Sequence, residues 1–576
     1  MSSTSDQLFA IAILIDELKH EEVSHRVSSM QHLRDIANAL GVERTQSELL
    51  PYLVDSCLDD EDEVLLAMAG ELGQFTKQVG GNSHALIAPL EALANVEEPA
   101  VRDKAVQGLV NIALEMTPIQ VEKYFCPLCK DLAKKDWFTS RITSAGLIPT
   151  VYGKIDSSLP TSALAKQELK QLFIELGKDD TPMVRKALAS NFPDLVNKCE
   201  VEVVNKDLVP LFSQLAMDEH DSVRLLVCPI GIAICKRLGS STSGMVSAQC
   251  ITLAADKGWR VRWSVAQVFH ELLGTSSNPN DLLPSFVQLI KDVEPEVRTA
   301  ATANLTKTAK IVKNLDVILP LLQDLCQDQS EHVREALALV VLGLAPIVGK
   351  QDTVKHLLPW FLLLLRDSNP QVRLGMVGEL ASLEGVVSID DLSVALLPAV
   401  IELAHDKNWR VRAQTIAHLP VLAKQMELAY FEANLMDICV HFLSDQVFTV
   451  REAGAGLVMQ ICKVFGTEWT LKKIVPSVQA LKLTNNYLYR LTAVRSMEVL
   501  MQAVDAEVTN RVLIPFILSL ANDPVPNVRF GVCKALKRTK LAKDHAEVKE
   551  CLQRLTVDKD KDVVFFAKRA LEVVTA

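Results

Sequence analysis

The chain has 576 residues, of which 49% are apolar, 5% aromatic and 23% charged. This much apolar surface supports an extensive core and excludes a disordered or collagen-like chain. The 60 Lys and Arg against 71 Asp and Glu give a net charge of −11, the opposite of a phosphate-binding surface, so we expect no nucleic-acid partner. The 12 cysteines are typical of reduced thiols that are buried in the core. The start of the chain contains Asp6 and Asp16 and does not resemble a secretory signal peptide. We therefore expect a cytoplasmic protein, with the nucleus as a second compartment.

A membrane partner is not expected either. The longest apolar run, residues 336–349, is interrupted by Pro346 and is shorter than the ~20 residues that cross a bilayer. The run is typical of a helix that is buried on most sides.

One short motif recurs along the whole chain. The dipeptide Val-Arg occurs with its Arg at residues 102, 185, 224, 262, 298, 334, 373, 412, 451 and 529. Arg26, Arg141 and Arg490 keep the phase without the Val, while Leu65 and Val564 stand where an Arg is expected. The steps between these positions define fifteen units of about 39 residues, which leave no room for a separate catalytic domain.

Two further residue types share this period. Asp lies six residues before the anchor in eleven units, at positions 59, 179, 218, 256, 292, 328, 367, 406, 445, 523 and 558. Pro lies thirteen or fourteen residues before it, at positions 51, 89, 127, 210, 284, 320, 359, 398, 476 and 515. Three residue types at one period indicate a repeat architecture.

Each unit, taken in chain order, reads as two helices joined by a polar turn. In the tenth unit, an apolar helix around Pro359 is followed by a turn at residues 366–371, and Val372, Met376, Val377 and Leu380 then recur at helical spacing. The proline should bend or start the first helix. Since one helix pair cannot bury its own apolar face, the pairs should stack, and we predict an all-α solenoid of about fifteen repeats with an elongated, curved superhelical form.

The repeated Arg falls in the first turn of the second helix, where the helix dipole disfavours a cation, so it needs an anionic partner. The Asp of the preceding turn can pair with the Arg of the same or the next unit. We predict a structural ladder; the alternative is that these are exposed turn residues of little energetic value. The ladder comprises Asp179, Arg185, Asp218, Arg224, Asp256, Arg262, Asp292, Arg298, Asp328, Arg334, Asp367, Arg373, Asp406, Arg412, Asp445, Arg451, Asp523 and Arg529.

Catalytic and metal-binding motifs are weak. The histidines His20 and His25 are five residues apart, where one helix face requires four, and Cys126 and Cys129 have no second pair at zinc-ligand spacing. There is no phosphate-binding loop and no nucleophile elbow. The basic stretch 534–543 is a helix end or, alternatively, a nuclear signal. We therefore predict no catalytic residue, no metal and no cofactor.

Aromatic residues in the turns are the remaining signal. Trp259-Arg260 and Trp409-Arg410 lie between the repeated Asp and the Val-Arg anchor, and Trp137-Phe138 occupies the same place in the fourth unit. Trp and Arg on an exposed edge are typical of protein-binding hot spots, whereas Trp packed against the neighbouring turn is the structural alternative.

The period, the three fixed positions and stretches such as DDTPMVRKALAS, DKGWRVR, NWRVRAQTIAHLP and DPVPNVRFGV resemble the structural A subunits of protein phosphatase 2A, which are built of fifteen HEAT repeats. The resemblance covers essentially the whole chain. It implies one continuous solenoid over residues 1–576, with repeats 1–8 (8–313) on a regulatory-subunit side, repeats 9–10 (314–390) as a flexible centre and repeats 11–15 (391–576) on a catalytic-subunit side.

The resemblance also implies the partners, namely the phosphatase 2A catalytic subunit and variable regulatory subunits, in heterodimers and heterotrimers. Lys186 stands where the family pattern has Arg, and the linker around Gly239–Gly244 departs from that pattern. The residues implied for the catalytic subunit are Trp409, Arg410, Phe448, Thr449, Tyr487, Leu488, Val525 and Pro526. Those implied for the regulatory subunit are Glu98, Pro99, Trp137, Phe138, Pro182, Lys186, Asp218, Trp259 and Arg260.

A scaffold without catalytic activity is thus the expected function. The rival is a transport adaptor of the importin type, which should carry a recurrent acidic or Asn/Trp ladder along its inner helices. A hydrolase is a third, remote hypothesis.

Overall fold

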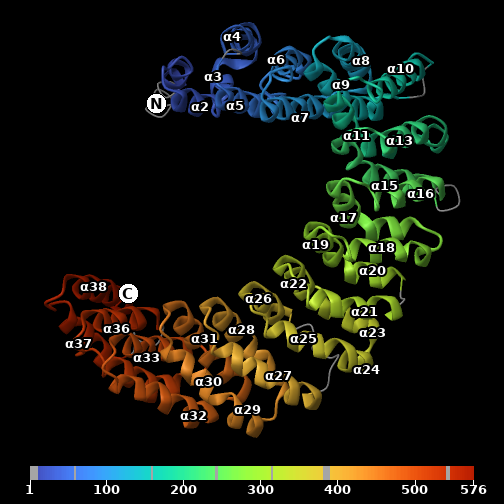
Figure 1. The fold of residues 1–576 in the computed structure, drawn as a ribbon. Coiled ribbons are helices and arrows are strands. Elements are labelled where there is room, and N and C mark those ends of the chain that lie inside the picture. Colours follow the sequence, from blue (N-terminus) through green and yellow to red (C-terminus); the bar gives the residue numbers. More distant parts are fainter. Residues whose placement is uncertain are drawn as a thin grey trace. The chain divides into compact units, whose positions relative to one another are not determined.

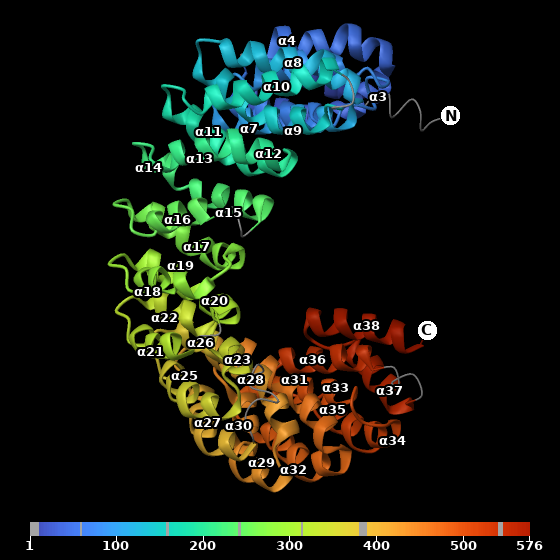
Figure 2. The same ribbon diagram turned by 90° about the vertical axis from the view of Figure 1, so that its right-hand side faces the viewer.

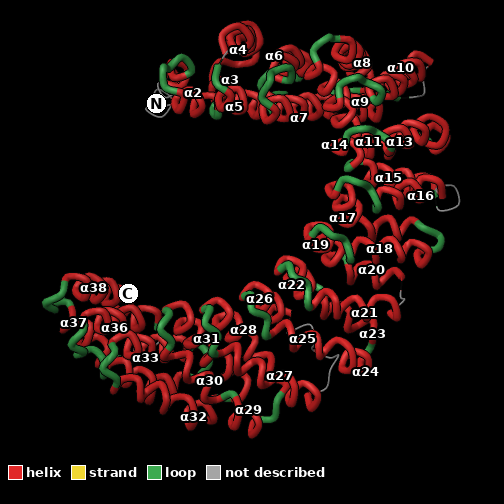
Figure 3. Tube along the Cα trace, in the orientation of Figure 1, coloured by secondary structure: helices red, strands yellow, loops and turns green. Residues whose placement is uncertain are grey.

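The computed structural model describes residues 11–57, 60–156, 160–239, 244–312, 315–379, 389–539 and 545–575. Within these ranges the chain forms helices joined by turns, with no strand (Figures 1 and 3). The chain divides into two compact units, residues 1–304 and residues 305–576. The predicted all-α class is confirmed; the curvature of the complete solenoid stays a prediction.

The first unit is a row of helix pairs, and successive pairs from α11 to α19 lie in layers (Figure 2). The second helices of neighbouring pairs contact one another from α5 through α7, α9, α11, α15 and α17 to α19. The helices are α2 (Val23–Met30), α3 (Leu33–Arg44), α4 (Leu50–Cys57), α5 (Asp62–Leu72), α6 (Ile87–Leu93), α7 (Pro99–Glu115), α8 (Pro118–Lys134), α9 (Phe138–Lys154), α10 (Pro160–Leu176), α11 (Pro182–Lys198), α12 (Val201–Val203), α13 (Val209–Ala216), α14 (Asp221–Arg224), α15 (Val227–Leu238), α16 (Gly244–Leu253), α17 (Trp259–Thr275), α18 (Leu283–Ile290) and α19 (Pro295–Ala303).

The second unit repeats this arrangement. Its second helices contact one another in the order α22, α26, α28, α31, α33, α36 and α38 (Figure 1). The helices are α20 (Leu305–Val312), α21 (Leu315–Cys326), α22 (Glu331–Ala338), α23 (Ala345–Val348), α24 (Lys350–Asp352), α25 (Leu358–Leu365), α26 (Pro370–Gly378), α27 (Ile389–Ala404), α28 (Trp409–Gln425), α29 (Leu428–Asn434), α30 (Met436–His441), α31 (Phe448–Phe465), α32 (Thr467–Ala480), α33 (Tyr487–Leu500), α34 (Ala506–Val508), α35 (Ile514–Leu518), α36 (Pro526–Arg538), α37 (Ala546–Leu555) and α38 (Lys561–Thr575).

The repeated valine explains why the period is so regular. The Val of every Val-Arg pair, ten in all, is fully buried at 0% exposure in the core between helices. Its neighbour in sequence, the Arg, therefore lies on the flank of the same first turn, at the edge where the paired helices join. A buried Val followed by an edge Arg fixes the rotation of each second helix about its own axis.

The repeated proline acts at the first helix of a pair. Pro210, Pro284, Pro359 and Pro515 lie in the first turn of α13, α18, α25 and α35. Each of these helices follows a short π-helical or 3₁₀-helical segment, at Val204–Leu208, Pro279–Leu282, Thr353–Leu357 and Thr509–Leu513. A proline has no N–H to donate, so the helical hydrogen-bond pattern changes just before it. The prediction that the proline starts a helix is confirmed in these pairs.

Some residues named in the sequence analysis lie outside the described ranges. Residues 240–243 of the linker around Gly239–Gly244 lie outside the described residues, and so do Asp59, Leu380 and the end of the basic stretch at residues 540–544. The rest of that stretch lies in the last turns of α36. None of the described helices is long and apolar enough to cross a bilayer.

Candidate functional site

The predicted binding residues lie where second helices begin. Trp259, Trp409, Phe448 and Tyr487 are the first residues of α17, α28, α31 and α33. The other members lie at the same junctions: Glu98 and Pro99, Trp137 and Phe138, Pro182 and Lys186, Asp218, Arg260, Arg410, Thr449, Leu488, Val525 and Pro526. In each unit these turns follow one edge of the helix row, which we call the ridge. Their roles in binding stay predictions.

Local hydrogen bonds fix the start of each helix. The side chains of Asn408 and Asn486 cap α28 and α33 by accepting from the N–H groups of Arg410 (2.9 Å) and Leu488 (3.0 Å). Glu98 accepts from the Ala100 N–H in the same way at α7. The capping residues thereby fix the start of each helix.

Two Trp-Arg pairs have the same geometry in both units. The guanidinium carbon of Arg260 lies 4.7 Å from the Trp259 ring centroid, and that of Arg410 lies 4.7 Å from the Trp409 ring centroid. Both arginines are exposed and both indoles are half-buried. Each guanidinium is thus close enough to its indole ring for a cation–π contact.

Two other ridge side chains are more exposed than Trp259 and Trp409. Phe448 is 65% exposed and Trp137 is 54% exposed. The sequence analysis missed a second set of exposed apolar residues next to the position of the repeated Asp, which Thr484 occupies in one turn, because it considered only aromatic side chains. This set consists of Met217, Val293, Leu483 and Val557, which are 82–84% exposed.

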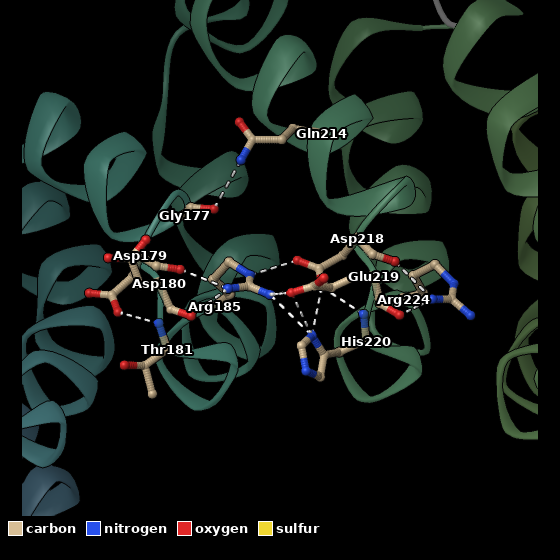
Figure 4. Close-up of polar contacts among 10 residues, drawn as sticks. All are labelled: Gly177, Asp179, Asp180, Thr181, Arg185, Gln214, Asp218, Glu219, His220 and Arg224. Atoms are coloured by element: carbon tan, nitrogen blue, oxygen red, sulfur yellow. Dashed lines mark hydrogen bonds and ion pairs between the residues drawn. The ribbon is translucent and has the colours of Figure 1, made fainter.

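The predicted Asp and Arg ladder is present, and Figure 4 shows one part of it. The Arg185 Nε and Nη2 atoms donate to the two carboxylate oxygens of Asp218 at 2.7 and 3.0 Å. Its Nη1 atom donates to the carbonyl oxygens of Asp179 and Asp180 at 2.7 and 3.2 Å, in its own turn. Asp218 also accepts from the His220 N–H at 3.0 Å. The guanidinium thus joins two successive turns.

Ten such pairs, which we call rungs, occur among the described residues. In nine of them the Arg Nε atom lies 2.6–2.8 Å from the Asp Oδ2 atom, and the Asp side chains are 4–11% exposed. The rungs are Arg26–Asp60, Arg141–Asp179, Arg185–Asp218, Arg224–Asp256, Arg262–Asp292, Arg334–Asp367, Arg373–Asp406, Arg412–Asp445, Arg490–Asp523 and Arg529–Asp558.

The rungs correct the predicted ladder in three respects. Each Asp pairs with the Arg of the preceding unit, and its own unit's Arg reaches only its carbonyl oxygen. Arg26, Asp60, Arg141, Arg490 and Asp558 belong to the ladder although it was predicted without them. Arg451, predicted as a member, has no carboxylate partner among the described residues, because Thr484 stands at the Asp position of the next turn. Arg298 and Asp328 keep the usual contacts within their own turns.

The rungs lower the pKa of their carboxyl groups. Burial is the largest influence and would by itself raise the pKa of Asp218, Asp256 and Asp445, but the Arg hydrogen bonds, the backbone N–H bond and the Arg charge together bring it below its usual range. The same balance lowers the pKa of Asp292, Asp367 and Asp523. At Asp558 the Arg529 hydrogen bond is the largest influence and lowers the pKa. These groups are ionised at neutral pH.

The predicted thiols do not form a reactive site. Cys126 and Cys129 are 3% and 0% exposed, and burial raises the pKa of Cys126 to about 11. The eleven cysteines whose side chains are described are all buried, and none of them forms a disulfide with another described residue. Over the same ranges, no group of His, Cys, Asp and Glu side chains is arranged to hold a metal ion.

Comparison with known proteins finds family models and relatives that match parts of this chain. A model described as "PPP2R1A-like HEAT repeat" matches residues 275–349, and the HEAT repeat model matches residues 396–426 and 513–538. The beta isoform of the human 65 kDa regulatory A subunit of serine/threonine-protein phosphatase 2A is 43% identical over 373 residues, 62% of this chain and 60% of the human one. The chain is a HEAT-repeat relative of the phosphatase 2A A subunits. The Dictyostelium discoideum protein phosphatase 2A scaffold subunit is 44% identical over 214 residues, 37% of this chain and 36% of that one.

The aligned part of this HEAT-repeat chain spans about 60% of the human relative. Among solved structures, a crystal structure of importin beta matches with a TM-score of 0.56 at 13% sequence identity, covering 98% of this chain and 79% of that one. A likeness at this identity shows the shared solenoid fold alone.

Proposed function

We propose that the chain is the scaffold of a phosphatase 2A assembly. In this proposal the ridge of the second unit, from Trp409 to Pro526, holds the phosphatase catalytic subunit. The ridge of the first unit, from Glu98 to Arg260, holds one of several regulatory subunits. The observation that carries the proposal is that all of these residues lie where second helices begin, on one edge of each unit.

The ridge has the chemistry of a protein interface. Phe448 is 65% exposed. The guanidinium carbon of the exposed Arg410 lies 4.7 Å from the Trp409 ring centroid. Aromatic and Arg side chains dominate the binding energy of protein interfaces because they bury much area with few flexible bonds. The turns that carry them are held by caps and rungs, so little conformational entropy is lost on binding.

We further propose that the chain positions its two partners relative to each other and catalyses no reaction itself. Its relatives are named as regulatory or scaffold subunits. Binding two proteins to one chain makes their encounter intramolecular, which raises avidity by ~10² to 10⁴ without a new contact. The partners form a heterodimer with the catalytic subunit and a heterotrimer when a regulatory subunit is added. We place this assembly in the cytoplasm and the nucleus.

An importin-like adaptor is the weaker alternative. The likeness to importin beta is one of fold, at 13% identity, and the tryptophans of this chain lie in turns and not along inner helices. No described feature favours cargo transport over phosphatase assembly.

Two matched substitutions test the proposal. Trp409→Ala should weaken binding of the phosphatase 2A catalytic subunit by roughly 30-fold, which is about 2 kcal/mol, as truncation of a hot-spot residue does. Trp259→Ala, the equivalent change in the first unit, should leave that affinity unchanged and weaken regulatory-subunit binding. Titration by surface plasmon resonance measures both, with circular dichroism as the check on folding. Equal effects of the two variants on the catalytic subunit would contradict the assignment of one partner to each unit.

A further inference from the structure

The ladder of the second unit has one open position, at Arg451. This side chain is 4% exposed, and its Nη1 atom donates to the carbonyl oxygens of Asp445 and Gln446 at 2.8 and 3.0 Å, as in every rung. Its Nε atom has no acceptor among the described residues. In the rungs on either side, Asp445 and Asp523 fill the corresponding place. Here the next turn offers Thr484.

A backbone donor is free at the same place. In the two neighbouring turns the N–H two residues after the Asp donates to the carboxylate, from Val447 at 2.8 Å and from Val525 at 2.9 Å. Thr484 has no carboxylate, and its hydroxyl donates to the carbonyl oxygens of Leu481 (2.7 Å) and Asn486 (3.3 Å) in its own turn. No described residue accepts from the Asn486 N–H. The Arg451 Nε atom and the Asn486 N–H, whose counterparts in the neighbouring turns bind a carboxylate, therefore have no carboxylate from the described residues.

We propose that this open rung binds a carboxylate supplied from outside, by an acidic side chain of the protein that docks on the ridge of the second unit. The inference rests on the proposed function, under which that protein is the phosphatase catalytic subunit. The ligand class follows from the donor set, because ten copies of the same arrangement hold an Asp carboxylate. Arg Nε and Nη2 side by side form the fork that matches two carboxylate oxygens.

The surroundings favour a protein side chain over a free anion. The Phe448 ring centroid lies 5.9 Å from the Arg451 guanidinium carbon, and this ring is 65% exposed. Leu483, beside Thr484, is 84% exposed. These apolar groups gain from contact with a protein surface and nothing from a small hydrated anion. A docking surface that covers them would also exclude water from the new ion pair, which strengthens it.

The first unit offers an internal comparison. Arg102 is 5% exposed, and its Nε atom also has no acceptor. The Asp position of the next turn is occupied by Lys135, whose Nζ atom lies 2.8 Å from a carboxylate oxygen of Glu91. Filling this position provides a control, because a new Asp there would add a rung far along the sequence from the proposed catalytic-subunit ridge.

The test supplies the missing carboxylate from the chain itself, by substitution of Thr484. Thr484→Asp places a carboxylate beside Arg451, as in the other rungs, so it should raise the melting temperature. The new carboxylate would occupy the site and repel the acidic side chain of the partner, so binding of the catalytic subunit should weaken by at least about tenfold. Lys135→Asp should leave this affinity unchanged. Asn485→Asp, which adds the same charge on the exposed neighbouring residue, should change it by less than about threefold. Isothermal titration with the full-length chain measures all three.

Each outcome decides the proposal. Wild-type affinity in Thr484→Asp overturns it, whether or not the melting temperature rises, and leaves the scaffold function standing. Equal weakening by Thr484→Asp and Asn485→Asp overturns it as well, since general repulsion would then suffice. A melting temperature of the wild type that rises in sodium acetate relative to sodium chloride, together with unchanged Thr484→Asp affinity, would assign the rung to free carboxylates. Failure of the wild-type chain to bind the catalytic subunit would instead refute the proposed function.

Discussion

The turns at Asp445 and Thr484 are neighbours in the second unit and differ in one decisive side chain. Arg412 is held by two carbonyl oxygens of its own turn, at 2.7 and 3.4 Å, and by the Asp445 carboxylate of the next turn. Arg451 has the same two carbonyl contacts, and no carboxylate of a described residue binds it. The carbonyl oxygens are therefore sufficient to orient the guanidinium, whereas the carboxylate is the part that links one repeat to the next.

The largest effect should come from breaking the intact rung. Asp445→Ala leaves the Arg412 guanidinium, whose side chain is only 13% exposed, and the Val447 N–H without their acceptor, so the free energy of unfolding should fall by about 3 kcal/mol. Thr484→Ala, the same truncation at the open rung, should cost less than about 1 kcal/mol. Chemical denaturation followed by circular dichroism measures both. Similar losses in the two variants would contradict the view that the carboxylate links the repeats.

Acidification should break the rungs gradually. The folded-state pKa of Asp445 and the other rung carboxyl groups lies below the unfolded value of about 3.9, so their contribution to stability is complete well above that pH. The contribution is lost as the pH falls through the lowered pKa values, because the proton then binds the unfolded chain first. The melting temperature should drop steeply below pH of about 4, and less steeply in Asp445→Ala. Identical pH profiles of the two proteins would show that this rung does not titrate as described.

The smallest effect should come from completing the open rung. Thr484→Asp adds a carboxylate to donors that are already in place, and it should raise the free energy of unfolding by about 1 kcal/mol, part of the gain being offset by burial of the new charge. The same denaturation measurement applies. A loss of stability would mean that Arg451 is not arranged to accept a carboxylate.

The repeat length and the buried face of each second helix follow from the sequence alone. Both are set by the Val of the Val-Arg pair, which is buried once in each helix pair that has it. The direction of the rungs does not follow, because each Asp lies only six residues before the Arg of its own unit, so distance along the sequence favours the wrong partner. Only the stacking of the pairs brings the Asp218 carboxylate to Arg185, while Arg224 contacts the Asp218 carbonyl oxygen.

The missed members of the ladder have specific causes. Arg141 and Arg490 follow Ser140 and Tyr489 in place of Val, so a strict Val-Arg criterion passes over them although they keep the period. Arg26 pairs with Asp60, one residue later than the repeat predicts. The open rung at Arg451 could have been predicted by asking which residue stands at the Asp position of each following turn. Its unpaired Nε atom is visible only in the structure.

The most direct test of the scaffold role is sedimentation velocity of the chain mixed with equimolar phosphatase 2A catalytic subunit and one regulatory subunit. The account predicts a single species with the mass of a 1:1:1 complex, which is reduced by Trp409→Ala to the chain with the regulatory subunit alone. Sedimentation of the three proteins as separate species, or displacement of one partner by the other, would contradict it.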